Sequence, residues 1–335
     1  MRARVNGYWT RLLDEVERDL ILGRAIGFDL AVRLTDLPDD LVPALGRLAN
    51  AMRRRESGRR VDLCSIISAR TGACAEDCAF CAQSKHHSAE CAVESMRSAD
   101  EIVAAAKRAE ANGVHRFCIV TSGGALSDAD FEVAVSAVAR IAEETALRRC
   151  ASLGSLSPAR IRRLAEAGLN RYHHNLETCR SFFGKICTTH TWEERAAVVR
   201  SLKAHGIETC CGGILNMGES PRQRVEFAFE LRALRPDSVP INFLDPRPGT
   251  PLAARARISA LEAAKYLAIF RLVLPHANLR LAGGRTSVFA EEPALPFRVG
   301  ADGLLVGDLL TTSGPAVRDD LDMLGSLGLD VGLDA

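Results

Sequence analysis

Short apolar runs alternate with longer amphipathic stretches from about residue 60 almost to the end of the chain. Eight of these runs have the length of β-strands, and helical patterns fill most of the gaps between them. Such alternation is typical of parallel strands joined by helices. The expected strands occupy residues 61–67, 115–121, 148–153, 171–177, 207–215, 238–244, 278–283 and 303–307.

Glycines support these boundaries. The stretches ANGV (111–114), EAGL (166–169) and AHGI (204–207) each place a glycine where a helix ends and a strand begins. Eight strand–helix units in about 250 residues predict an α/β fold, a TIM-type (βα)8 barrel whose site lies at the carboxyl ends of the strands. The alternative is an open doubly wound sheet, which is less favoured because no G-x-G-x-x-G turn follows the first strand.

The chain divides into three expected parts. Residues 1–58 have the apolar spacing of helices and predict an N-terminal helical extension. The barrel is expected over residues 59–325. The glycine-rich residues 326–335 are expected to form a flexible C-terminal tail.

Charge and cysteine content narrow the class of protein. The 335 residues carry a net charge of +1, which gives no broad electrostatic reason to expect a nucleic-acid or membrane partner. No stretch approaches the ~20 apolar residues of a membrane span, and no signal peptide opens the chain. We therefore expect a cytoplasmic protein. Its 11 cysteines then favour metal or redox chemistry over a disulfide framework.

The most specific motif is TGACAEDCAFCAQS, which follows the first expected strand and carries Cys74, Cys78 and Cys81. Three thiolates can hold three irons of a cubane cluster and leave the fourth iron open to an exogenous ligand. A zinc site would need a fourth ligand, which His86 or His87 could supply. Three ordinary buried cysteines are less favoured, because free cysteines seldom cluster unless their reactivity is used.

The C-x3-C-x-Φ-C pattern, with Phe80 before the last cysteine, resembles the radical S-adenosylmethionine (SAM) superfamily. The resemblance implies that SAM fills the open iron of a 4Fe–4S cluster and is cleaved to a 5′-deoxyadenosyl radical. Over residues 10–330 the chain resembles the biotin synthase family, which implies sulfur insertion into dethiobiotin to give biotin. The motifs that carry this resemblance are CSIISARTGACAEDCAFCAQS, RFCIVTSGG, ASLGSLS, YHHNLET, CTTHTWEER, CCGGILNMGE, SVPINFLDPRPGTPL, LRLAGGR and VGDLLTT.

Site residues follow from this resemblance position by position. Glu177 matches a residue at the SAM ribose, where a carboxylate suits two hydroxyls. Arg195 matches the arginine that pairs the SAM carboxylate, although a surface salt bridge with Glu193 or Glu194 competes with that role. Asn242 matches a residue that binds the ureido ring of dethiobiotin. The other matched residues are Cys74, Cys78 and Cys81 at the 4Fe–4S cluster, Phe80 beside the adenine, Ser122, Gly123 and Gly124 at the methionine part, and Asn175 at SAM or substrate.

The resemblance also implies a second, sacrificial iron–sulfur cluster that donates the sulfur. In one form of the family it is 2Fe–2S, and the matching ligands here are Cys118, Cys150, Cys210 and Arg280, each on a different expected strand. In a second form it is larger and held by cysteines alone, which here would be Cys64, Cys150, Cys187 and Cys210. Both sets are complete in this sequence, so both remain open. No role is assigned to Cys91, Cys179 or Cys211.

The adjacent histidines His173 and His174 are not expected to share a metal ion, because neighbouring strand residues face opposite sides. A hydrogen-bonded barrel histidine is expected instead. The implied partners are dethiobiotin, an electron donor such as flavodoxin or ferredoxin, and a second copy of the chain in a homodimer. Two other functions are kept: a radical SAM enzyme of the same subgroup with another substrate, and a non-catalytic iron–sulfur carrier. A carrier would not need Asn175, Glu177 and Arg195.

Overall fold

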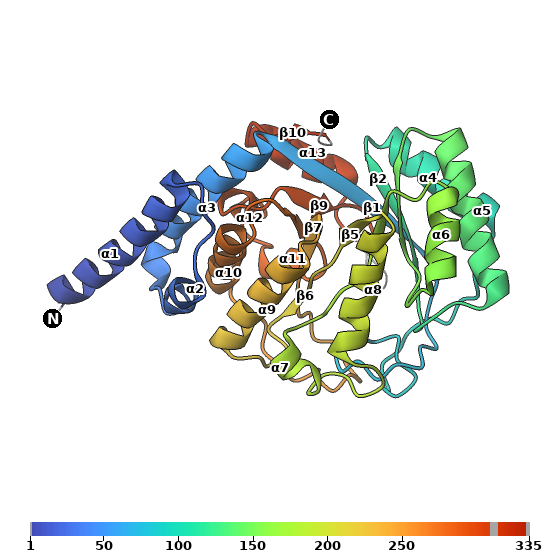
Figure 1. Ribbon diagram of the computed structural model, residues 1–335, viewed down its shortest axis with the longest axis horizontal. Helices are drawn as coiled ribbons and strands as arrows, with labels where there is room; N and C mark the ends of the chain where they lie inside the picture. Colours follow the sequence, from blue (N-terminus) through green and yellow to red (C-terminus); the bar gives the residue numbers. More distant parts are fainter. Residues whose placement is uncertain (1, 309–313, 333–335) are drawn as a thin grey trace.

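The computed structural model describes residues 2–308 and 314–332. Its strands are β1 (Arg60–Arg70), β2 (Arg116–Thr121), β3 (Arg148–Ser152), β4 (Arg171–His173), β5 (Glu208–Cys210), β6 (Gly213–Leu215), β7 (Ser238–Phe243), β8 (Asn278–Leu281), β9 (Gly303–Leu305) and β10 (Asp330–Val331). β1 pairs in parallel with β2 on one side and with β9 on the other, which closes the sheet into a barrel (Figure 1). The predicted TIM-type (βα)8 barrel is confirmed.

All eight expected strands are present, with ends that differ by a few residues from the expected ones, and two of the expected runs are divided or cut short. The run 207–215 is divided into β5 and β6, because the chain passes β7 very closely at Gly212. A Cβ atom there would lie 2.0 Å from the carbonyl oxygen of Pro240. The run 171–177 forms a ladder only as far as His173, since the backbone then turns toward Glu177, which has a positive φ of 69°.

Helices surround the barrel and join its strands (Figure 1). Three helices end, as expected, next to a glycine whose backbone is in the left-handed conformation. Gly113, Gly168 and Gly206 have φ values of 80°, 88° and 72°. The helices are α1 (Arg2–Ile21), α2 (Phe28–Leu34), the 3₁₀ helix η1 (Asp39–Leu41), α3 (Val42–Ser57), α4 (Ala99–Ala111), α5 (Asp128–Glu144), α6 (Pro158–Glu166), α7 (Arg180–Phe183), α8 (Trp192–Ala204), α9 (Pro221–Leu234), α10 (Ala260–Val273), α11 (Arg285–Val288), α12 (Leu295–Arg298) and α13 (Val317–Ser326).

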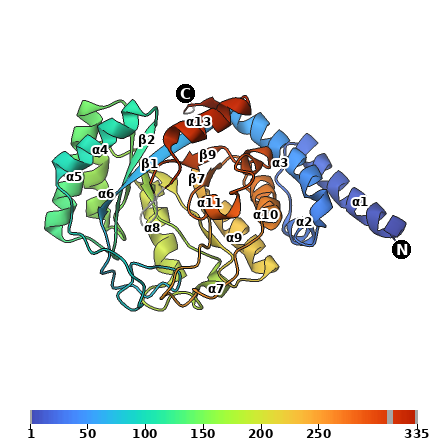
Figure 2. The ribbon, with the colours of Figure 1, turned by 180° about the vertical axis from the view of Figure 1, so that it is seen from behind.

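The N-terminal helices pack on the outside of the barrel (Figure 2). α3 lies against α10 and α12, and α2 lies against α9. The hydrophobic core fills the layer between the strands and these helices; Met52 of α3 and Phe270 of α10 are both fully buried in it. The core therefore lies around the barrel, and the interior holds the thiols of Cys64, Cys118 and Cys150 together with apolar side chains such as Ile66 and Val120.

Part of the C-terminal segment that is expected to be flexible forms a short strand. Within residues 326–335, β10 pairs in parallel with β1, with Asp330 opposite Arg60. Residues 309–313, which carry most of the VGDLLTT motif, lie outside the described residues, as do residues 333–335. Among the described helices, none has the length and apolarity required to cross a lipid bilayer.

Candidate active site

One cavity of about 980 Å³ lies at the carboxyl ends of the strands and reaches down into the barrel. Seven cysteines line it from two directions. Three come from the loop after β1, and four come from the strands themselves. These are Cys74, Cys78 and Cys81 in the loop, and Cys64, Cys118, Cys150 and Cys210 on β1, β2, β3 and β5.

The cysteine loop is folded back on itself by backbone hydrogen bonds. The amide of Cys74 donates to the carbonyl of Gln83 (2.9 Å), and the carbonyl of Cys74 accepts from the amide of Lys85 (2.9 Å). The amide of Cys81 donates to the carbonyl of Cys78 (2.9 Å). The ends of the loop are thus tied together, and its three thiols are held over a short span of chain.

The thiols of this loop are suited to a positively charged metal group. Burial raises the pKa of Cys81 to about 11. A hydrogen bond to Cys187 and burial both raise the pKa of Cys78 above its ordinary value. A buried thiol gives up its proton readily when a metal cation takes the proton's place. The three thiols, which the folded loop holds within a short span of chain, fit a 4Fe–4S cluster with one open iron.

Asn175, Glu177 and Arg195 lie together at the side of the cavity. The guanidinium of Arg195 donates through Nη2 to Glu177 Oε1 (3.0 Å) and through Nε to the carbonyl of Asn175. Asn175 Nδ2 also donates to Glu177 Oε2 (3.3 Å). Burial raises the pKa of Glu177, although Arg195 acts against this shift. The arrangement offers a planar donor and a carboxylate to a polar ligand.

Neither glutamate expected to compete for Arg195 contacts it. Glu193 pairs with Arg180, and Glu194 accepts from the amide of Thr191 at the start of α8 (2.7 Å). Arg195 therefore points inward to the cavity that it lines.

The backbone at Glu177 is strained and held in place by β6. A left-handed conformation in a residue other than glycine costs about 1–3 kcal/mol. The carbonyl of Glu177 accepts from the amide of Ile214 (2.8 Å), and a Cβ atom on Gly213 would lie 2.2 Å from that carbonyl oxygen. Only glycine at position 213 allows this approach, which fixes the Glu177 side chain toward the cavity.

The strand end Ser122–Gly124 and the aromatic Phe80 also line the cavity. Ser122 Oγ donates to the carbonyl of Gly72 (2.8 Å), and Gly123 has a φ of 101°. A Cβ atom on Gly124 would lie 2.4 Å from Glu76 Oε1, so the backbone there is bare toward the cysteine loop. Phe80 packs on an apolar group formed by Ile186, Met217 and Leu244.

Asn242, at the end of β7, presents a partly used amide to the cavity. Its Nδ2 donates to the carbonyl of Gly213 (3.0 Å), and its Oδ1 accepts from the amide of Gly283 (2.8 Å). Each atom still has capacity for one further hydrogen bond. The two backbone contacts fix the orientation of the amide.

The barrel cysteines form a second group, deeper in the cavity. Cys118 and Cys150 lie directly opposite each other on β2 and β3, and Cys64 packs against them. Burial raises the pKa of Cys64 to about 12 and that of Cys210 to about 11. A hydrogen bond from Cys118 lowers the pKa of Cys150. Arg280 of β8 lines the same cavity as these four cysteines.

A layer of buried arginines lies beneath these thiols. Arg280 Nη2 donates to Asp62 Oδ2 (2.6 Å), and Arg171 Nη1 lies 3.3 Å from the same oxygen. Arg116 is buried, and its Nε and Nη1 have no hydrogen-bond partner among the described residues. Arg116 and Arg171 also line a second cavity of about 420 Å³ at the amino ends of the strands. Arg116 is nevertheless within ion-pair distance of Asp62 (Nε to Oδ2, 3.6 Å) and of Glu208 (Nη2 to Oε2, 3.6 Å). Buried cationic side chains beside buried thiols fit an anionic thiolate-bound cluster.

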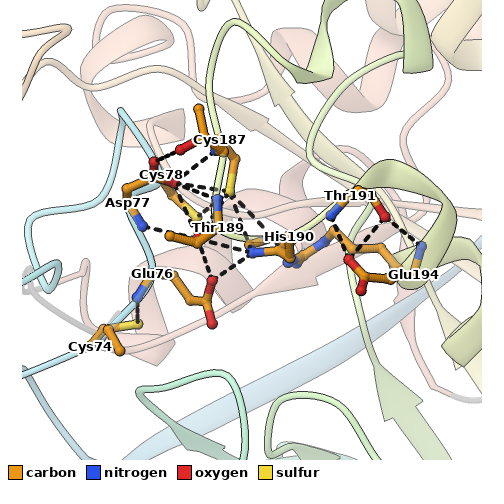
Figure 3. Close-up of polar contacts among 12 residues, drawn as sticks. Cys74, Glu76, Asp77, Cys78, Cys187, Thr189, His190, Thr191 and Glu194 are labelled. Carbon is orange, nitrogen blue, oxygen red and sulfur yellow. Dashed lines mark hydrogen bonds and ion pairs between the residues drawn. The ribbon is translucent and has the colours of Figure 1, made fainter.

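Cys187 lies elsewhere. Its Sγ is 3.9 Å from Sγ of Cys78 (Figure 3), and it is not among the described residues that line the cavity. The alternative set of Cys64, Cys150, Cys187 and Cys210 is thus divided between two neighbourhoods. Cys211 packs in the core around the barrel, because neighbouring residues of an extended chain point to opposite sides and Cys210 lines the cavity.

Three residues of this neighbourhood had no role in the sequence analysis. His190 hydrogen-bonds through Nδ1 with Glu76 Oε2 (2.7 Å), and Asp77 accepts from the amide of Thr188 (2.9 Å) (Figure 3). The only sequence signal was the CTTHT run, in which His190 follows Cys187 by three positions.

The two adjacent histidines both line the cavity, since β4 ends at the first of them. His173 Nδ1 hydrogen-bonds with Ser152 Oγ (3.1 Å), and burial lowers the pKa of His173 to about 4. His174 Nε2 has no hydrogen-bond partner among the described residues.

Two family models match the chain in succession. Residues 69–231 match the Radical SAM superfamily, and residues 240–330 match the Biotin and Thiamin Synthesis associated domain. The chain is 46% identical over 320 residues to a biotin synthase of Heliobacterium modesticaldum, covering 96% of this chain and 98% of that protein. It is 45% identical over 318 residues to a biotin synthase of Acetivibrio thermocellus, covering 94% and 98%.

Solved structures show the same fold at low identity. Methylornithine synthase superposes with a TM-score of 0.81 at 20% identity, covering 95% of this chain and 97% of that one. The FeFe-hydrogenase maturase HydG of Carboxydothermus hydrogenoformans gives 0.81 at 15% identity, covering 99% and 82%.

Proposed function

Because the chain belongs to the biotin synthase family of radical SAM enzymes, we propose that it converts dethiobiotin to biotin by inserting a sulfur atom. The observation that carries this proposal is that two separate groups of cysteines line one and the same cavity. When bound, the 4Fe–4S cluster and SAM supply a 5′-deoxyadenosyl radical, and the auxiliary cluster supplies the sulfur. The chain's own residues hold, orient and enclose these groups.

At the mouth of the cavity, Cys74, Cys78 and Cys81 would hold the 4Fe–4S cluster. Arg195 would pair the SAM carboxylate, and Glu177 would accept hydrogen bonds from the ribose hydroxyls. Their mutual ion pair supports this assignment, because it holds both side chains in place before the ligand arrives. Phe80 would offer the adenine an apolar surface, and Ser122, Gly123 and Gly124, which line the same cavity, would lie along the methionine part of SAM.

Deeper in the barrel, Cys118, Cys150, Cys210 and Arg280 would hold the auxiliary cluster. The facing register of Cys118 and Cys150 supports this set. Cys64 packs against Cys118 and Cys150 and is the alternative to Arg280 as a cluster ligand. Arg280 itself forms an ion pair with Asp62. Mössbauer spectra of the loaded protein and of Cys64→Ala would decide: an unchanged 2Fe–2S signal supports the arginine set, and its loss supports Cys64.

Asn242 would bind the ureido ring of dethiobiotin. A urea presents both N–H donors and a carbonyl acceptor, and the amide of Asn242 has one free donor and one free acceptor position. Asn175 shares the cavity, although its Oδ1 already accepts from the amide of Gly212 (3.0 Å).

The remaining partners are proposed from family resemblance alone. A flavodoxin or ferredoxin would deliver the electron, and the chain would work as a homodimer. Thiolate ligands need a reducing compartment, so we place the enzyme in the cytoplasm.

The test is an anaerobic reaction of the reconstituted chain with SAM, a strong reductant and dethiobiotin, read by mass spectrometry. Formation of 5′-deoxyadenosine and biotin together is the expected result. Deoxyadenosine without biotin or a thiolated intermediate would point to another substrate. Neither product from iron-loaded protein would favour an iron–sulfur carrier.

A further inference from the structure

A compact group of metal-binding side chains lies beside the cysteine loop, and two of its members have no part in the proposed reaction. Sγ of Cys78, Sγ of Cys187 and a ring nitrogen of His190 all lie within 4.8 Å of one another (Figure 3). Cys187 and His190 come from the segment between α7 and α8, three positions apart. Thiolate and imidazole are the ligands that zinc and ferrous iron favour.

The distances correspond to one tetrahedral ion. With metal–sulfur bonds of about 2.3 Å and metal–nitrogen bonds of about 2.0 Å, two sulfurs on one tetrahedral ion lie about 3.8 Å apart, and a sulfur and a nitrogen about 3.5 Å. The two sulfurs here are 3.9 Å apart. Sγ of Cys187 is 3.6 Å from His190 Nε2 and 3.4 Å from Nδ1, and a ring nitrogen of His190 lies within 4.8 Å of Sγ of Cys78.

The histidine already has the second partner that metal-bound histidines usually have. His190 Nδ1 lies 2.7 Å from Glu76 Oε2. A proton on Nδ1 satisfies that contact and leaves the lone pair on Nε2, as in carboxylate–histidine–zinc arrangements. Nε2 now accepts from Arg195 Nη1 (2.8 Å). A cation on Nε2 would displace that single contact, while Arg195 keeps its bonds to Asn175 and Glu177.

The carboxylate of Asp77 lies close to where a fourth ligand of this ion would be. Asp77 Oδ1 lies 3.3 Å from Sγ of Cys187, and it also accepts from the amides of Thr188 and Thr189. The carboxylate is therefore held in place by other bonds. Either Asp77 or a water molecule could complete four-coordination.

We propose that the chain without its 4Fe–4S cluster binds one zinc or ferrous ion through Cys78, Cys187 and His190 Nε2. Cys78 cannot serve this ion and the cluster at once, so the ion must leave Cys78 before the cluster is complete. The site is thus a mononuclear metal site that competes with cluster assembly. Metal binding at this site depends on the position of Cys187 beside Cys78 and not on the identity of the substrate.

The test uses cobalt as a spectroscopic probe for the metal, under anaerobic conditions. The full chain is first freed of metal, and Cys118→Ala and Cys150→Ala are combined so that the barrel cysteines do not contribute. One equivalent of Co²⁺ should then give intense tetrahedral d–d bands and a thiolate-to-cobalt charge-transfer band, both removed by one equivalent of Zn²⁺.

Four further variants in this background separate the site from the cluster ligands. Cys187→Ser and Cys78→Ala should each remove the tetrahedral signal. Cys74→Ala should keep it, although it removes a cluster ligand. Glu76→Gln should weaken cobalt binding by about 10- to 100-fold through the lost carboxylate partner of His190. An undiminished signal in Cys187→Ser, or equal loss in Cys74→Ala and Cys78→Ala, would overturn the proposal.

A second readout follows 4Fe–4S assembly by absorbance and electron paramagnetic resonance after addition of iron and sulfide. One equivalent of Zn²⁺ added beforehand should slow assembly in the background chain and leave the rate unchanged in the Cys187→Ser variant. Equal slowing in both proteins would contradict competition at Cys78. Cys179→Ser, which changes a cysteine buried away from the cavity, serves as the control for loss of a thiol.

Discussion

At the scale of single residues, the two cysteine groups share one cavity but have different electrostatic neighbours. The loop thiols lie beside the ion pair of Glu177 and Arg195, whereas the barrel thiols lie above buried arginines. The positive charge of Arg116, Arg171 and Arg280 acts on Cys150 and helps to lower its pKa. The two groups are therefore prepared for separate tasks, and substitutions in them should have separable effects.

Cys78→Ala should abolish SAM cleavage, because it removes one of the three thiolates that hold the 4Fe–4S cluster. Cys150→Ala should leave SAM cleavage intact and stop sulfur insertion, with biotin falling to background. The yields of 5′-deoxyadenosine and biotin, measured by mass spectrometry, check this. An equal loss of both products in Cys150→Ala would contradict the division of roles.

The buried His173 should make the stability of the cluster-free chain depend on pH. Its pKa is lowered from 6.5 to about 4, so between these pH values the unfolded chain binds more protons than the folded chain. The free energy of unfolding should therefore be highest above pH 6.5. It should fall by at most about 3 kcal/mol as the pH is lowered to 4, because only the unfolded chain takes up the proton in this range. Denaturant unfolding of the wild type and of His173→Asn between pH 7 and 4 checks this, and the same slope in both proteins would rule it out.

The loop cysteines could be predicted because their spacing is local, within eight residues of chain. The contact between Glu76 and His190 could not be predicted, because it joins residues that are 114 positions apart in the sequence. The position of Cys187 was missed for the same reason. Sequence alone gave two complete ligand sets, and only the packing of β1, β2 and β3 groups Cys64 with Cys118 and Cys150.

At the scale of elements, the start of α8 determines where Arg195 lies. Thr191 Oγ1 accepts from the amide of Glu194 (3.2 Å), and the Glu194 carboxylate accepts from the amide of Thr191 (2.7 Å). This reciprocal cap fixes the first turn of α8, which carries Arg195 toward Glu177. A feature of helix stability is therefore also a feature of the SAM site.

Thr191→Ala should lower the free energy of unfolding by about 1 kcal/mol and also weaken SAM binding. Ser98→Ala is the matched control, because Ser98 forms the same capping box with Glu101 on α4, which carries none of the proposed SAM contacts. It should cost a similar free energy and leave the SAM dissociation constant unchanged. Equilibrium dialysis with labelled SAM and denaturant unfolding measure the two effects, and equal SAM affinities in both variants would contradict the positioning argument.

The ends of the strands were harder to predict from the sequence than their positions along the chain. The period of apolar residues located all eight strands, and glycines located several helix ends. The apolar run over 171–177 gave no sign that the regular strand ends at His173 and that only an isolated bridge follows, between Glu177 and Gly213, because that bridge depends on the close approach of Gly213 to Glu177. Such contacts are made between distant segments and leave no local pattern.

At the scale of the whole molecule, one buried carboxylate joins the N-terminal helices to the barrel. Asp302 accepts from Arg271 of α10 (2.7 Å), from the amide of Leu279 on β8 (2.7 Å) and from Ser57 at the end of α3 (2.5 Å). Arg271 and Asp302 are both almost fully buried. The helical extension is thus tied to the barrel through this group and packs as part of one unit.

Asp302→Asn should lower the free energy of unfolding by about 3 kcal/mol or more, because it leaves the buried guanidinium of Arg271 without a counter-charge. Arg298→Ala, which removes an exposed ion pair with Glu292, should cost less than about 1 kcal/mol. Denaturant unfolding of both variants gives the comparison. Similar losses in the two would show that Asp302 does not tie the helices to the barrel.

Most TIM-type barrels fill their interior with layers of packed side chains, whereas a cavity of about 980 Å³ reaches down into this barrel, with thiols and arginines among the residues that line it. Bound clusters, SAM and substrate would supply the missing interior contacts and stabilise the folded chain by mass action. A copy that has lost its cofactors would open more often and be degraded sooner. The lifetime of the protein in a cell would then follow its supply of iron and sulfur, so that inactive copies are removed first.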